Sequence, residues 1–187
     1  IGVSRVIDEN YHNQPEKYVE GLYKLGIATP LNLDIPGAAK KPNIRKPTKE
    51  NWYKTALPWM SIGYETQVPP MNTLAFYNAI ANNGKMVKPM LHKGETEVIN
   101  QQIASKSNIN NIQIAMEKFV SEGLGKLALS EKVKVAGASG RSQISKDDEE
   151  IKEYVVMFCG YFPADKPKYS IIVSMNKMGL PASGSVM

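Results

Sequence analysis

The sequence predicts an α/β (α+β) fold in which helices flank an antiparallel sheet. Three β-rich runs that follow one another closely, with turn residues between them, predict the sheet. Longer periodic segments that begin at proline or polar residues and end at glycine predict the helices. The chain has 187 residues, a length that suits one domain or part of a larger one.

Helices are expected in four places along the chain. Residues 1–10 favour the continuation of a helix that begins upstream, and residues 15–26 an amphipathic helix between a proline and a glycine. Residues 70–84 predict a central buried helix, because apolar residues surround most of its circumference. Residues 108–122 predict a helix with one apolar face. That face consists of Ile109, Ile112, Met116, Phe119 and Val120.

The remaining segments predict a loop and strands. Residues 27–58 are expected to form a long loop, because they are rich in proline and lysine and have little periodicity. Loops of that length tend to be functional or to lie across another surface. Residues 85–91 predict a short strand or extended segment. The three-stranded portion of the sheet is expected over residues 132–177, with the acidic run 147–150 at its first hairpin.

Composition excludes some classes of function. Lys and Arg number 23 against 18 Asp and Glu, and the resulting charge of +5 is too small to predict nucleic-acid binding. No apolar run approaches the roughly 20 residues that span a bilayer, and no signal peptide opens the chain. The single cysteine, Cys159, is expected to be a small buried apolar residue. His12 and His92 have no further ligands at metal spacing, so neither a metal nor a cofactor is expected.

Several segments, in one order along the chain, carry a resemblance to a known family. They are residues 59–65, residues 70–84 with the following Lys88-Pro89, and residues 120–125, 158–163, 166–169 and 181–184. Together they resemble the C-terminal part of the transpeptidase domain of division-type class B penicillin-binding proteins. The resemblance implies that residues 1–187 are the C-terminal portion of a single such domain. The fold would then be the penicillin-binding and serine β-lactamase-like fold, incomplete in this chain.

The resemblance also implies a place for the third catalytic motif of this family, Lys-Thr/Ser-Gly. Ala138, Ser139, Gly140 and Arg141 stand at that place. The family strand pairs its backbone with the substrate, and its glycine permits the close approach. Ala138 replaces the lysine, and strand alternation places Arg141 with Ser139, so Arg141 is a poor substitute for the lost charge. These four residues are predicted to form a degenerate substrate-binding motif; without the resemblance, the same run indicates an edge strand with no ligand.

The other two family motifs are not found in their expected setting. No Ser-x-x-Lys, which would supply the nucleophile and its base, occurs in a helical context. The Ser-x-Asn motif would lie immediately before Ile1. The chain alone is therefore predicted to have no catalytic residue and to be inactive.

The resemblance implies a role for the whole protein. It would cross-link peptidoglycan stem peptides through a serine acyl-enzyme during septal cell-wall synthesis, and β-lactams would react with the same serine. It would be membrane-anchored, with this domain on the extracytoplasmic face of the cytoplasmic membrane. Its partners would be the stem peptide or a β-lactam, the rest of its own domain and division proteins. Two alternatives stay open: a dead pseudoenzyme that serves as a binding or scaffold module, and a serine hydrolase related to β-lactamases.

Overall fold

The computed structural model describes residues 2–34, 41–48, 50–144 and 153–179. The acidic run 147–150 and the segment 181–184 lie outside these residues. The helices are α1 (Gly2–Tyr11), α2 (Pro15–Lys24), α3 (Ala56–Met60), α4 (Pro70–Ala81) and α5 (Lys106–Ser121), and a 3-10 turn, η1 (Lys126–Ala128), follows α5. The strands are β1 (Asn43–Ile44), β2 (Thr66–Gln67), β3 (Met86–Val87), β4 (Val98–Asn100), β5 (Ala136–Gln143), β6 (Glu153–Phe162) and β7 (Tyr169–Met178).

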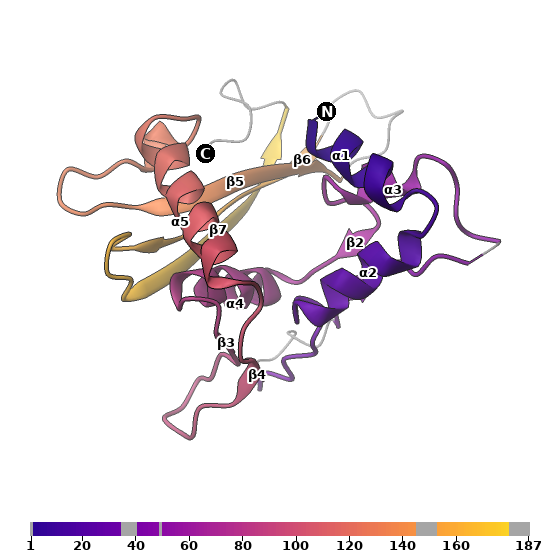
Figure 1. Cartoon of the computed structure of the whole chain (residues 1–187). Helices are drawn as coiled ribbons and strands as arrows, with labels where there is room; N and C mark the ends of the chain where they lie inside the picture. Colours follow the sequence, from indigo (N-terminus) through magenta and orange to yellow (C-terminus); the bar gives the residue numbers. More distant parts are fainter. Residues whose placement is uncertain (1, 35–40, 49, 145–152, 180–187) are drawn as a thin grey trace.

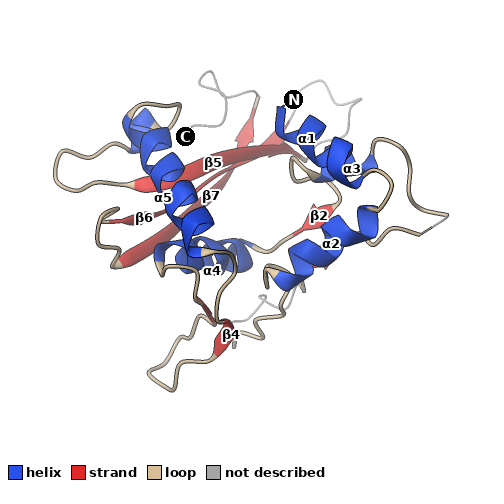
Figure 2. Ribbon diagram, viewed as in Figure 1, coloured by secondary structure: helices blue, strands red, loops and turns tan. Residues whose placement is uncertain are grey.

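The largest sheet has the order β5-β6-β7, and both of its strand pairs are antiparallel (Figure 2). Helix α4 packs against β6 and β7, and α5 crosses over β5 (Figure 1). The predicted antiparallel sheet with flanking helices is therefore confirmed. Consecutive strands are therefore neighbours throughout this sheet.

The main hydrophobic core lies between this sheet and helices α4 and α5. Helix α4 starts at Pro70, where a missing backbone N–H costs nothing, and ends before Asn83 and Gly84, which have φ of 52° and 98°. The buried residues of this core are Ala75, Ala79, Ile80, Ala81, Met86, Ile103, Ile109, Met116, Ala136 and Tyr161. The prediction that α4 is a central helix is confirmed.

A second, smaller core joins α2, β1 and α3. Val19, Ala28, Ile44 and Met60 are buried there, and Trp52 packs against them. The only buried polar side chain among the described residues, Asn72 of α4, ties this part to the main core. Its amide donates hydrogen bonds to the carbonyl oxygens of Ile27 (3.1 Å) and Thr29 (2.7 Å). These hydrogen bonds satisfy the buried amide group, which would lower the stability of the fold if it had no partners.

The predicted apolar face of α5 is partly wrong. Ile109, Met116 and Val120 are buried as expected, but Ile112 is 43% exposed. Gln113 faces inward instead, and its amide donates a 2.7 Å hydrogen bond to the carbonyl oxygen of Ile80. A polar side chain thus takes an inward position because it finds a partner on α4, which apolar periodicity does not reveal.

The prediction of an unbroken loop over residues 27–58 is wrong for two short segments. Strand β1 pairs with β2 in an antiparallel ladder, and helix α3 begins at Ala56. Strand β4, which pairs with β3, was not expected either. Strands of two or three residues are too short for side-chain alternation to be seen, so only their partners define them.

Candidate functional site

The four predicted site residues lie on β5, and the register of the sheet divides them between two faces. Ala138 is opposite Cys159 and Gly140 opposite Met157, whereas Ser139 is opposite Phe158 and Arg141 opposite Val156. Residues directly opposite in an antiparallel pair point to the same face. Ala138 and Gly140 therefore share one face of the sheet, and Ser139 and Arg141 share the other.

The face that carries Ala138 is the one covered by helices. Ala136, two residues before it, is opposite Tyr161, and both belong to the main core with α4 and α5. A lysine at position 138 would therefore project on the helix side of the strand. Arg141 is exposed on the opposite face. Its guanidinium cannot replace a charge at position 138 without a change of register.

The two glycines of β5 have different surroundings above the face of the sheet that each one occupies. A Cβ at Gly137 would stand 2.5 Å from the ring of Phe158 and 2.8 Å from the carbonyl oxygen of Cys159. A Cβ at Gly140 would meet no atom within 4 Å. Among the described strands β5 pairs with β6 alone, so its outer edge has no strand partner. The face of the strand is therefore open at Gly140 and closely packed at Gly137.

Cys159 lies on β6, opposite Ala138, and its thiol is unreactive. It is 2% exposed, and burial raises the pKa of its thiol to about 12, only partly opposed by a hydrogen bond from the backbone of Gly160. The thiolate is the reactive form of cysteine, so this side chain is not a nucleophile at neutral pH. The expectation that it is a buried apolar residue is confirmed.

One Ser-x-x-Lys spacing does occur, but in a strand. Residues 174–177 read Ser-Met-Asn-Lys and lie within β7. Ser174 is opposite Met157 and Lys177 is opposite Tyr154, which point to different faces of the sheet. On a helix this spacing brings both side chains to one face, whereas on a strand it separates them. The lysine therefore cannot act as the base of this serine.

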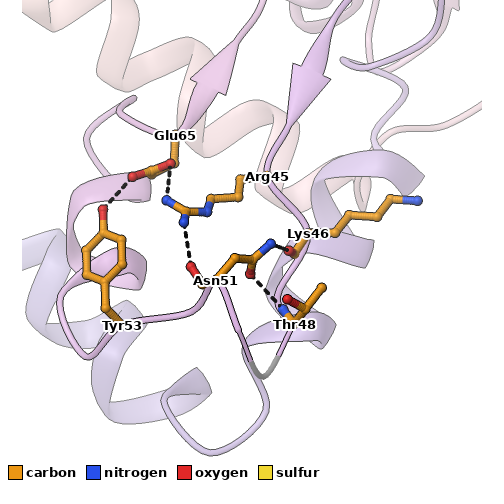
Figure 3. A network of polar contacts seen from close by, with 6 residues as sticks. All are labelled: Arg45, Lys46, Thr48, Asn51, Tyr53 and Glu65. Atoms are coloured by element: carbon orange, nitrogen blue, oxygen red, sulfur yellow. Dashed lines mark hydrogen bonds and ion pairs between the residues drawn. The ribbon is translucent and has the colours of Figure 1, made fainter.

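A polar network around Arg45 is the feature that the sequence did not predict (Figure 3). The Arg45 guanidinium donates to Glu65 Oε2 at 2.8 Å and to the carbonyl oxygen of Asn51 at 2.5 Å. The Tyr53 hydroxyl donates to the other oxygen of the Glu65 carboxylate. The hydrogen bond from Tyr53, together with Arg45, lowers the pKa of Glu65, so this carboxylate stays ionised. Asn51 completes the network through Thr48 N (2.8 Å) and the Lys46 carbonyl (3.2 Å).

Two kinds of feature are absent from the part of the chain that the structure describes. No group of three or more His, Cys, Asp or Glu side chains there could hold a metal ion. None of the described helices combines the length and the apolar character that crossing a membrane requires.

Comparison with protein families finds one match, over residues 6–187, to the penicillin binding protein transpeptidase domain. Stage V sporulation protein D of Bacillus subtilis is 26% identical over 62% of this chain and 20% of its own length. The probable peptidoglycan D,D-transpeptidase PbpC of Pseudomonas aeruginosa is 28% identical over 94% of this chain and 30% of its own length. The chain thus spans less than a third of these curated relatives.

Solved structures share the fold. The transpeptidase domain of penicillin-binding protein 3 from Burkholderia pseudomallei superposes with a TM-score of 0.73 at 22% identity, over 87% of this chain and 49% of that domain. A mycobacterial penicillin-binding protein 3 complexed with ampicillin gives a TM-score of 0.71 at 21% identity, over 91% and 42% of the two chains. At this level of identity, the likeness establishes the fold alone.

Proposed function

Because this chain belongs to the penicillin-binding protein transpeptidase domain family, we propose that it is part of a peptidoglycan D,D-transpeptidase of septal cell-wall synthesis. In the whole protein a serine hydroxyl would attack the carbonyl of a D-alanyl-D-alanine stem peptide and expel the terminal D-alanine. The covalent acyl-enzyme would then pass its acyl group to an amine of a second peptide. A β-lactam would acylate the same serine.

The observation that carries this proposal is that β5 has no second strand neighbour among the described residues and has an open face at Gly140. An extended peptide can add to an unpaired strand edge through backbone hydrogen bonds, which supply much of its affinity. The open space above Gly140 and the lack of a strand neighbour among the described residues leave room for such a peptide. Ser139 and Arg141 would then contact the ligand from one face, while Ala138 and Gly140 line the other.

In this proposal the present chain does not catalyse the reaction by itself. Its third-motif position has Ala138 where the family carries a lysine, and the loss of one preorganised electrostatic group costs about 10²–10³ in rate. The nucleophile and its base would come from the part of the whole protein that this chain does not span. The protein would work on the extracytoplasmic face of the cytoplasmic membrane, anchored there, with the rest of its domain and division proteins as partners.

Labelling with a fluorescent penicillin tests the proposal. The reagent is applied to this chain and to the gene product as its source cells make it, and the labelled peptide is identified by mass spectrometry. We expect no covalent label on the chain and a labelled serine outside it in the gene product. A label within the chain contradicts its inactivity. A gene product without any label contradicts the transpeptidase proposal.

The second candidate is a catalytically dead module that binds peptidoglycan or a division protein. The replacement of lysine by Ala138 on a strand that keeps its open edge favours it. If the gene product is not acylated, titration calorimetry with a peptide ending in D-alanyl-D-alanine tests this second candidate. Saturable binding that weakens in Arg141→Gln would support the binding module, and a flat titration would contradict it.

A further inference from the structure

The Arg45 network closes a loop around helix α3. Tyr53 precedes α3 and Glu65 follows it, and the hydrogen bond between their side chains joins the two ends (Figure 3). Arg45, next to the end of β1, adds the 2.8 Å ion pair to Glu65, and its guanidinium lies 5.3 Å from the centre of the Tyr53 ring. The short helix is thus held at both ends by contacts outside it.

Glu65 is the centre of this arrangement, and its backbone has a conformation that is rare for a residue with a side chain. Its φ is 59°, in the left-handed region that residues with a side chain rarely adopt. Its carbonyl oxygen accepts a 3.1 Å hydrogen bond from the backbone N–H of Arg45. Side-chain exposures of 31% for Arg45 and 23% for Glu65 make the ion pair half-buried, so solvent screens it less than a surface pair.

Helix α3 in turn holds the first turn of α1. Ser61, which directly follows α3, has its hydroxyl 2.8 Å from the hydroxyl of Ser4. The two helices pack against each other (Figure 1). Helix α1 has ten residues and none of them is buried. A helix this short is marginal by itself, so its neighbours fix its position.

We propose that Arg45 and Glu65 are positioning residues of the transpeptidase. They fix α3, and through α3 they fix the first turn of α1. This inference rests on the proposed function and on the family resemblance, which implies a Ser-x-Asn motif of the whole protein immediately before Ile1. In that arrangement the ion pair would help to hold the start of the helix that the motif precedes.

Hydrogen exchange of the natural gene product tests the structural part. Arg45→Met removes the ion pair and both side-chain hydrogen bonds. Lys88→Met is the matched control, because it removes the Lys88–Glu97 ion pair, also 2.8 Å, from the β3–β4 hairpin. We expect exchange in α1 to be about fivefold faster in Arg45→Met, and exchange in α5 to stay unchanged. Glu65→Gln replaces Arg45→Met if that variant does not fold. Unchanged exchange in α1 would overturn the inference.

Acylation by a fluorescent penicillin tests the functional part. We expect Arg45→Met to lower the first-order acylation constant about tenfold, because small misplacements of reacting groups are costly, and to leave the dissociation constant of the initial complex unchanged. Arg45→Lys, which keeps the ion pair, should restore most of the rate. Normal acylation beside faster α1 exchange would overturn the positioning role. If the unmodified gene product is not acylated at all, the failure belongs to the proposed function, and the exchange result alone decides whether the network holds α1.

Discussion

Phe158 lies directly over Gly137 of the neighbouring strand, so close that a Cβ at position 137 would be 2.5 Å from its ring. Gly160, which is opposite Gly137, lies under the same ring, with 3.1 Å between a Cβ there and Phe158 Cε1. The aromatic ring therefore packs on the bare backbone of two strands. Such contact is a reason for a glycine inside a strand, where its flexibility otherwise weakens the sheet.

Gly137→Ala should destabilise the protein. The new methyl group would meet both the Phe158 ring and the backbone oxygen of Cys159, and overpacking of this kind costs about 1–3 kcal/mol. Urea denaturation followed by circular dichroism measures the free energy of unfolding. Gly140→Ala is the control, because a Cβ there meets nothing within 4 Å. Equal stability losses in the two variants would contradict the difference between the two glycines.

Tyr161→Phe should leave stability unchanged or raise it. The Tyr161 side chain is 1% exposed, and its hydroxyl has no hydrogen-bond partner among the described residues. Removing this hydroxyl should raise the free energy of unfolding by about 1 kcal/mol or less, because the folded state no longer has to desolvate an unsatisfied polar group. Thermal unfolding measures the effect. A fall in the unfolding midpoint of several degrees would mean that the hydroxyl has a partner in solution.

Cys159 should not react with thiol reagents in the folded protein at pH 8. Burial raises its pKa from the ordinary 9.0 to about 12, so the fold favours the neutral thiol. The corresponding stability is fully present below pH 9 and is lost as pH rises from 9 to 12. Unfolding midpoints across this range should decline less in Cys159→Ala than in the unmodified protein. Rapid labelling at pH 8 without denaturant would show that the thiol is accessible.

Ala138→Lys should speed β-lactam acylation of the natural gene product by about 10²-fold, if the family mechanism operates there. The new ammonium group would project on the helix side of β5, where the family lysine is expected. Ser142→Lys is the control, because Ser142 lies on the same face of the strand two positions further on from Gly140. Equal acceleration by the two lysines would mean that added positive charge anywhere on this face raises the rate, and that its position at residue 138 does not matter.

Much of the fold could be predicted because its elements carry strong local signals. Helix α4 is bracketed by Pro69-Pro70 and Asn83-Gly84. The strands of the main sheet are eight to ten residues long, and β6 is mostly apolar. The predictions were wrong where the conformation of a residue or segment depends on a partner elsewhere in the chain. Gln113 faces inward only because the Ile80 carbonyl accepts its hydrogen bond, and β1 exists only because β2 lies beside it.

The candidate site could be placed on its strand, but its supporting network could not be foreseen. The alternation of β5 was enough to separate Arg141 from Ala138. Arg45 and Glu65, in contrast, are 20 residues apart in the sequence and belong to a segment without periodicity. No local pattern relates two such residues, so only the folded chain shows that they meet.

The two hydrophobic cores also determine the order in which the protein can fold during its synthesis. The smaller core is made by buried residues between Val19 and Met60, and the larger one by residues from Ala75 onward. The buried residues of the smaller core thus all precede those of the larger one, against which Leu25 also packs. Since a ribosome releases the N-terminal part first, helices α1 to α3 can pack together before the strands of the main sheet have been translated.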